Sequence, residues 1–277
     1  MNSIFKDEFY RIVDSEIVIE GLKKEYVFMH ISDMHMSVND TLSDEAEIAD
    51  NNESEKTWRE LREYFANTFG EPYTSEHTLS SEASFDKMIA LAKELKPEAL
   101  LLSGDMLNHL TGGSIRALRK KLCEYDGKYM FVPGNHDPGT SVGLTKDSVQ
   151  VIDCGELLIV GIDNSMRTLS DLQLTELKAL CTIGKPIIIL QHIPAMTDVN
   201  RDYLTGFGEY FSVDINSEDK NAAELVRIEA QEPCVKAVLC GHIHGYRELG
   251  IAEGKRQISA SSGLIGLVHR VTVRGVK

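Results

Sequence analysis

The sequence predicts an α/β fold in which strands and helices alternate along the chain. Short apolar runs of strand length, segments with apolar residues at helical spacing between them, and an ordinary globular composition all support this class. The chain has 277 residues, of which 42% are hydrophobic and 26% charged. A chain of this length can bury roughly three quarters of its unfolded surface. We therefore predict a single domain over residues 1–277, with an acidic, partly helical insertion at about 40–83.

Six short apolar runs are predicted to be strands that are buried on both faces. They cover residues 26–31, 100–102, 129–132, 157–162, 187–190 and 237–240. The chain changes character near its ends, and further strands are expected at 17–19, 257–260 and 270–273. We expect these to add antiparallel neighbours to a mixed sheet.

Four segments between the strands have the apolar spacing of amphipathic helices. They cover residues 84–95, 114–125, 170–180 and 219–230. Pro97 stops the first helix, and the third opens with the capping-box pattern Ser170-Asp171-Leu172-Gln173.

The acidic segment 40–83 interrupts this alternation. It holds 12 acidic and three basic residues, together with the only tryptophan of the chain. Trp58, Leu61, Phe65 and Phe69 fall at helical spacing, which predicts a helix. We expect its apolar stripe to pack on the body of the protein, because such stripes are usually core. The alternative is a lid or a partner surface beside the active site.

Composition and charge disfavour several classes of protein. The formal net charge of −14 argues against a nucleic-acid partner. The apolar runs are far too short to cross a bilayer, and the first residues lack the basic head and apolar stretch of an export signal. The five cysteines are scattered without a C-x-x-C pair, which indicates reduced thiols. We therefore expect a cytoplasmic protein without a membrane span, and the oligomeric state stays open.

Polar side chains follow five of the predicted strands at the points where the strands end. In chain order they are Asp33 and His35, Asp105, then Asn135, His136 and Asp137, His192, and finally His242 and His244. The ligand crevice of an α/β sheet lies at the carboxyl ends of its strands, so we expect these side chains to converge. The pairs separated by two residues can point the same way from an extended backbone.

Four imidazoles, two carboxylates and one amide favour a metal site. Such donors suit Mn, Fe or Zn, with Ni or Co possible, and Mg would want more oxygen. Seven donors are too many for one tetrahedral ion but suit two divalent or trivalent ions that share a carboxylate. Ions about 4 Å apart can activate water and hold both oxygens of a phosphoryl displacement. For any one of these residues a turn or loop role is the ordinary alternative, but seven converging donors without a metal would be costly.

At these residues the sequence resembles the calcineurin-like metallophosphoesterase superfamily. Its pattern D-x-H, G-D, G-N-H-D, H and G-H-x-H occurs here complete and in order, over about residues 26–245. The resemblance implies a four-layer α/β/β/α sandwich with two mixed β-sheets.

The resemblance also implies a role for each side chain. One metal would be held by Asp33, His35, Asp105 and His244. The second metal would be held by Asp105, Asn135, His192 and His242, with Asp105 as the bridge. His136 would stay unligated beside the leaving group as general acid or transition-state donor, and Asp137 would orient it by hydrogen bonding.

Departures from related patterns narrow the expected function. The chain lacks the D-R-G sequence that protein serine/threonine phosphatases have after G-D, and Asn108 stands where purple acid phosphatases place a metal-binding tyrosine. Residues 15–33 look similar to bacterial small-molecule and envelope phosphodiesterases. We therefore expect hydrolysis of a small-molecule phosphodiester by attack of a metal-bound hydroxide. The alternatives are a phosphomonoesterase acting on a small molecule, or an interaction module with a vestigial metal site.

Three other positions lie close to the motifs. His109 can overlook the site, although an ordinary role is expected. Arg247 can hold a substrate phosphate, but a surface ion pair is the expected role. Asp163 and Asn164, at another strand end, can support the donors or form a turn.

Overall fold

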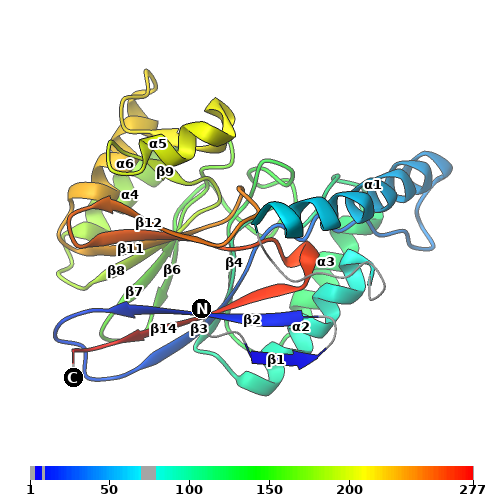
Figure 1. Ribbon diagram of the computed structural model, residues 1–277, viewed down its shortest axis with the longest axis horizontal. Helices are drawn as coiled ribbons and strands as arrows, with labels where there is room; N and C mark the ends of the chain where they lie inside the picture. Colours follow the sequence, from blue (N-terminus) through cyan, green and yellow to red (C-terminus); the bar gives the residue numbers. More distant parts are fainter. Residues whose placement is uncertain (1–3, 8–9, 70–78, 277) are drawn as a thin grey trace.

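The computed structural model describes residues 4–7, 10–69 and 79–276, and it contains two six-stranded sheets with helices on their outer faces (Figure 1). The first sheet consists, in spatial order, of β1 (Ile4–Asp7), β2 (Tyr10–Val18), β14 (Leu267–Arg274), β3 (Tyr26–Ile31), β4 (Ala99–Leu102) and β5 (Tyr129–Phe131). The second consists of β12 (Arg247–Ala252), β13 (Lys255–Ser259), β11 (Val235–Cys240), β8 (Ile187–Leu190), β7 (Leu158–Gly161) and β6 (Gln150–Asp153). A short parallel pair joins β9 (Ala195–Met196) to β10 (Val213–Asp214).

Helices cover the outer face of each sheet. The longer ones are α1 (Glu45–Phe69), α2 (Ser81–Leu95), α3 (Gly112–Cys123), α4 (Asp171–Cys181) and α6 (Lys220–Gln231). The shorter ones are α5 (Arg201–Leu204) and the 3-10 turns η2 (Thr205–Phe207), η3 (Glu209–Phe211) and η4 (Gly263–Ile265). In Figure 1, α2 and α3 lie beside the first sheet, α4 and α6 beside the second, and α1 extends to one side.

Alternation of apolar side chains along the strands produces the four layers. In β4, Leu100 and Leu102 pack with the buried residues of α2 and α3, whereas Leu101 belongs to the core between the two sheets. In β8, Ile188 and Leu190 face that same middle core, while Ile187 and Ile189 pack with α4 and α6. Each inner strand is buried on both faces for this reason, as expected from its continuous apolar run.

Both sheets are mixed. Strands β3, β4 and β5 are parallel, and β14 joins them antiparallel through β3. The predicted strand at 257–260 corresponds to β13, which has an antiparallel neighbour in β12, as expected, and a parallel one in β11. Both pairings arise because the chain first runs back along β12 and then reverses in a hairpin.

Two edge strands escape the sequence patterns. The side chains of β6 alternate between half-buried and exposed, and β12 does the same along most of its length. An edge strand with one face toward solvent has no continuous apolar run, which is the signal that identified the inner strands.

The caps of the helices explain where they begin. Helix α2 starts at Ser81, three residues before the predicted start, because the Ser80 hydroxyl caps it by accepting from the amide of Ala83 at 3.1 Å. Ser170 caps α4 as predicted, accepting from the Gln173 amide at 3.2 Å. The Gln173 side chain does not close the capping box, because its oxygen accepts from the amide of Asp163 at 2.8 Å. Among the described residues, none of the helices combines the length and the apolar character that a membrane span requires.

Candidate metal centre

The structure brings the predicted donor side chains together where the two sheets place their carboxyl ends. Asp33 and His35 follow β3, Asp105 follows β4, and Asn135 and His136 follow β5. His192 follows β8, and His242 and His244 follow β11. Donor atoms lie within 4.8 Å of one another in three overlapping groups, which are Asp33 with His35 and His244, Asp105 with His192 and His242, and His35 with Asp105 and His136.

The backbone carries this arrangement in a strained conformation. Five of the seven expected metal donors have a left-handed backbone, with φ of 54° at Asp33, 45° at His35, 50° at Asp105, 71° at His242 and 55° at His244. Each such residue costs about 1–2 kcal/mol. We expected the side chains separated by two residues to point the same way from an extended backbone. This expectation is wrong, because the backbone at these residues is left-handed and loop hydrogen bonds hold the side chains in place. The amides of Asp33 and His35 donate to the carbonyls of Gly104 and Asp105 at 3.1 and 2.9 Å.

Asp137 fixes these loops. One of its carboxyl oxygens accepts from the amides of Gly134 and Asp105 at 2.6 and 3.1 Å, and the other accepts from the amides of Met106 and Leu107 at 2.8 and 3.3 Å. The hydrogen bond that we expected between Asp137 and His136 is replaced by these contacts. Asp137 is fully buried beneath the loops, so its carboxylate reaches backbone amides of two strand ends.

Two glycines permit the close approach of these loops. A side chain at Gly134 would overlap the Asp105 carboxylate. A Cβ at Gly104, where φ is +86°, would lie 2.5 Å from the amide nitrogen of Gly134 and 2.8 Å from Nδ1 of His192. Glycine at both positions leaves room for donors that arrive from neighbouring strands.

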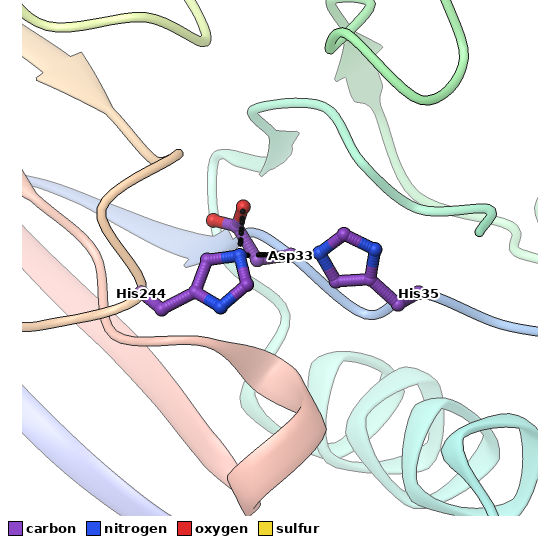
Figure 2. A group of neighbouring side chains, drawn as sticks. All are labelled: Asp33, His35 and His244. Carbon is purple, nitrogen blue, oxygen red and sulfur yellow. Dashed lines mark hydrogen bonds and ion pairs between the residues drawn. The ribbon is translucent and has the colours of Figure 1, made fainter. Parts of the chain in front are cut away.

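The first half of the site contains Asp33, His35 and His244. Figure 2 shows the two imidazole rings turned toward each other beside the Asp33 carboxylate. Nε2 of His244 lies 3.3 Å from Asp33 Oδ1 and 3.2 Å from Nε2 of His35. Ligands bound about 2.1 Å from one metal ion lie roughly 3.0–3.4 Å apart, so these separations fit a shared ion.

The second half brings together four side-chain atoms that can each bind a metal ion. The ring of His192 is oriented by its Nδ1, which donates to the Ser103 carbonyl at 2.7 Å. The ring of His242 is oriented by its Nε2, which donates to the Tyr210 carbonyl at 3.1 Å. The two ring nitrogens that then face each other, His192 Nε2 and His242 Nδ1, lie 3.1 Å apart.

Two oxygens complete this group. Asn135 Oδ1 and Asp105 Oδ2 lie 3.1 and 3.3 Å from Nε2 of His192. A proton on His192 Nε2 can bridge these atoms in the metal-free protein, and a metal ion in the same position would offset the repulsion between their lone pairs. The donor chemistry therefore fits a metal ion, and backbone carbonyls behind both rings fix the tautomers as they do in metal sites.

Asp105 links the two halves. Its Oδ2 atom lies 3.3 Å from His192 Nε2 and 3.9 Å from His35 Nε2, which belong to different halves. Its Oδ1 atom accepts from the amide of His136 at 2.8 Å. The carboxylate is buried, and its position suits a ligand shared by two ions.

Burial and charge set the protonation of the imidazoles. Burial lowers the pKa of His35 to about 3, and burial together with His192 lowers that of His242 to about 4. Both rings are thus neutral at physiological pH, which is the form that binds metals. Burial also acts on His192, but the Asp105 carboxylate outweighs it and raises the pKa of His192 to about 9. The second half of the site therefore attracts positive charge.

His136 lies at the edge of the site and is half-buried. Its Nδ1 atom donates to the Asn108 carbonyl at 2.9 Å, and its ring meets that of His35 edge-on with centroids 4.7 Å apart. Because Nδ1 carries the proton for Asn108, Nε2 can donate only when the ring is an imidazolium.

A cavity of about 610 Å³ opens over the donors. It is lined by His35, Asp105, Asn135, His136 and residues 242–244, together with Trp58, Tyr64, Thr68 and residues 206, 207, 210 and 211. The sequence favours core packing for Trp58, but the structure places this side chain in the wall of the cavity. For this residue the alternative, a position beside the site, is correct. The side chains of Phe65 and Phe69 lie outside the described residues.

The secondary positions divide between support and surface roles. Asn164 supports the site, because its side-chain oxygen accepts from the amides of His192 and Ile193 at 3.1 and 3.0 Å. Asp163 forms a turn by accepting from the Ser165 amide and hydroxyl at 3.0 and 2.6 Å. His109 is exposed and lies outside the cavity. Arg247 lies over the ring of Tyr203, with its guanidinium carbon 5.8 Å from the ring centre.

Comparison with known proteins identifies the family. The model of the calcineurin-like phosphoesterase family matches residues 26–246, which is most of the chain. The chain belongs to this family. Among curated proteins, no sequence matches this calcineurin-like phosphoesterase.

Solved structures share its fold. A dimetal phosphatase from Danio rerio has a TM-score of 0.53 at 10% identity, covering 87% of this chain and 88% of its own. The purple acid phosphatase PPD1 from yellow lupin seeds has a TM-score of 0.49 at 14% identity, covering 93% of this chain and 46% of its own. A putative 5'-nucleotidase from Staphylococcus aureus has a TM-score of 0.45 at 11% identity, with coverage of 87% and 49%. The first of these supports the two-sheet fold of the calcineurin-like phosphoesterase, and at such identities the likeness concerns the fold alone.

Sequence reasoning missed the groups that hold the donors in place. The carbonyls of Ser103, Asn108 and Tyr210 orient three imidazoles, and a backbone atom leaves no mark on residue type. Trp58 was visible as the only tryptophan, yet its spacing suggested core packing.

Proposed function

We propose that this calcineurin-like phosphoesterase is a dinuclear metal-dependent phosphodiesterase. The observation that carries the proposal is the convergence of His242 Nδ1, Asn135 Oδ1 and Asp105 Oδ2 on His192 Nε2, at 3.1, 3.1 and 3.3 Å. Family membership supports the metal-dependent hydrolysis of a phosphoric ester. The donor set supports Mn, Fe or Zn, with Ni or Co also suited to imidazole-rich sites.

Each half of the site would hold one of the two ions. Asp33, His35, Asp105 and His244 would hold one ion, and Asp105, Asn135, His192 and His242 would hold the other. When bound, a pair of such ions supplies positive charge that activates water and stabilises the phosphoryl group in the transition state. Asp137 holds the loops that carry Asp105 and Asn135, so we assign it a positioning role.

His136 would deliver the proton to the leaving group. Its ring is held by the Asn108 carbonyl through Nδ1 and lines the cavity. Proton transfer from Nε2 to the departing oxygen leaves a neutral imidazole that still donates to Asn108.

The charge of the cavity favours a diester over a monoester. A phosphodiester carries one negative charge at neutral pH, whereas a phosphomonoester carries nearly two. No lysine or arginine is found among the described residues that line the cavity, so only the bound ions and His136 would balance a second negative charge. The five cysteines, all free, support a reducing compartment such as the cytoplasm.

A paired substrate assay tests the proposal. With Mn²⁺ present, we expect hydrolysis of bis-p-nitrophenyl phosphate with a higher kcat/KM than that of p-nitrophenyl phosphate. Asp105→Asn should remove nearly all activity and reduce the metal content, while Asp153→Asn, a change at an exposed aspartate on β6, should alter neither. A preference for the monoester would replace the diesterase by a phosphomonoesterase. Absence of turnover with every candidate metal would contradict the proposal.

A further inference from the structure

The cavity above the donors has two aromatic walls. One comes from α1 and presents Trp58, Tyr64 and Thr68. The other comes from η2 and η3 and presents Phe207, Tyr210 and Phe211. The floor between the walls is formed by the donors of the candidate metal centre. A group attached to a phosphoester bound at this floor therefore extends between aromatic side chains.

The α1 wall is fixed to the first half of the floor. The ring of Trp58 stacks on that of His35, with centroids 3.9 Å apart and an angle of 17° between the planes. Its Nε1 donates to the Asn108 side-chain oxygen at 2.7 Å, and the Asn108 amide nitrogen donates to the Ser54 hydroxyl at 2.8 Å. The position of this wall is thus set by the same residue whose carbonyl orients His136.

The opposite wall is fixed to the second half of the floor. The ring of Phe211 lies 5.1 Å from that of His242, and the Tyr210 carbonyl accepts from His242 Nε2 at 3.1 Å. The Tyr210 side chain remains 75% exposed, although its backbone is tied to the site. Tyr64 on the α1 wall is 61% exposed. Exposed aromatic rings that line a cavity are typical of ligand contacts.

The chemistry of these walls favours aromatic groups on the ligand. The described residues that line both walls are uncharged. One cation lies beside them, because the guanidinium carbon of Arg167 is 5.4 Å from the centre of the Tyr210 ring. Flat aromatic groups stack well on tyrosine and phenylalanine rings.

We propose that the cavity selects phosphodiesters that carry a planar aromatic ester group, and that Tyr210 is a specificity-determining residue for that group. This inference rests on the proposed function, because the phosphoester must lie on the donor floor. An aryl or benzyl ester and a nucleoside ester share the required chemistry.

Two diesters isolate the contribution of the flat ring. Benzyl methyl phosphate and cyclohexylmethyl methyl phosphate have the same charge, similar size and the same kind of primary alkoxide leaving group. With Mn²⁺ present, we expect KM to be about 3- to 10-fold lower for the benzyl ester, the range that one or two aromatic contacts provide. Tyr210→Ala should bring the ratio of the two KM values close to one. Tyr129→Ala, which removes a half-exposed tyrosine outside the cavity, should leave the ratio unchanged.

A third substrate, a nucleoside ester, distinguishes the two candidate aromatic groups, a benzyl or aryl group and a nucleobase. The methyl ester of adenosine 5'-phosphate is assayed beside the benzyl ester, and the arm with the larger Tyr210→Ala effect on KM identifies the group that the walls bind. Equal KM values for the benzyl and cyclohexylmethyl esters, with no effect of Tyr210→Ala in either arm, would overturn the inference while hydrolysis itself upheld the proposed function. Hydrolysis of neither diester would contradict the proposed function instead.

Binding without turnover gives a second readout. Trp58 is the only tryptophan, so protein fluorescence excited at the indole band reports directly on the cavity. Methyl benzylphosphonate, which joins the benzyl group to phosphorus through carbon, should change this fluorescence with a Kd about 3- to 10-fold lower than that of its cyclohexylmethyl counterpart. Equal Kd values for the two phosphonates would contradict selection by the aromatic walls.

Discussion

The donor floor and the aromatic walls of the cavity are built in opposite ways. On the floor, Asp33, His35 and Asp105 are at most 1% exposed, have left-handed backbones and are held by loop hydrogen bonds. On the walls, Tyr64 and Tyr210 stand 61% and 75% exposed on a helix and a 3-10 turn. Burial and these hydrogen bonds hold the floor side chains in place, which is the kind of preorganisation that electrostatic catalysis uses. The walls can change without disturbing the floor, which is where we expect substrate selection to reside.

Each wall nevertheless contacts one half of the floor through an imidazole. Trp58 stacks on His35, and Phe211 packs against His242. A partner-binding role for the α1 aromatic residues with a vestigial metal site is disfavoured by this contact, because Trp58 faces the donors and not a separate surface. We propose that segment 40–83 is an insertion that shapes the site.

The largest effect on activity is expected for His136, which would protonate the leaving group. His136→Ala should lower kcat by about 10²–10⁴-fold, the usual contribution of a general acid, with the metal content unchanged. The loss should be greater for benzyl methyl phosphate than for bis-p-nitrophenyl phosphate, because p-nitrophenolate departs without a proton. Steady-state kinetics with both substrates and metal analysis of the same samples provide the measurement.

A neighbouring histidine is the matched control. His109 is exposed, outside the cavity and one residue from Asn108, so His109→Ala should retain the activity of the unmodified protein. An equal loss for both leaving groups in His136→Ala would mean that His136 does not act as the acid.

The next effect concerns the support behind the floor. Glu229 on α6 is fully buried beside Gln191, the residue before His192, and burial raises its pKa from 4.5 to about 8. The folded protein therefore keeps a proton that the unfolded chain loses between these pH values. The protonated Glu229 therefore adds to the free energy of unfolding. This stabilisation is complete below pH 4.5 and is lost as the pH rises through about 8.

Glu229→Gln removes the titrating group from this site. The stability of the variant relative to the unmodified protein should increase between pH 5 and pH 8.5 by on the order of 4 kcal/mol. Urea unfolding of both proteins in EDTA at several pH values measures the difference. A stability difference that stays constant with pH would show that Glu229 is ionised in the folded protein.

The smallest effect is that of the walls. Removing the Tyr210 ring should change discrimination between aromatic and saturated esters by about 3- to 10-fold, far less than the loss expected for His136. If Tyr210→Ala reduced kcat for both esters by orders of magnitude, floor and walls would not be separable in the way described.

The sequence predicts the floor well and the walls poorly, for a physical reason. Asp33, Asp105 and His192 follow continuous apolar runs that identify inner strands, and parallel strands bring their carboxyl ends together. Side-chain chemistry then suffices to predict a metal site. The α/β class and the inner strands followed from the same apolar runs, whereas the four-layer arrangement was predicted from the resemblance to the family.

The contacts that orient the donors could not be predicted in the same way. The interaction of Asp137 with four backbone amides and that of His242 with the Tyr210 carbonyl depend on loop paths. Tyr210 itself lies in 3-10 turns between β9 and β10, where apolar spacing carries no periodic signal. Edge strands β6 and β12 were missed because one face is open to solvent.

Manganese binding tests the central claim most directly. Titration of the metal-free protein with Mn²⁺, followed by electron paramagnetic resonance, should show two ions per chain with the coupled spectrum of ions that share a bridging ligand. Quenching of Trp58 fluorescence should accompany it, since the indole stacks on His35. Asp105→Asn should abolish the coupled spectrum. Binding of one ion or none, or of two ions without coupling, would contradict a dinuclear centre built around Asp105.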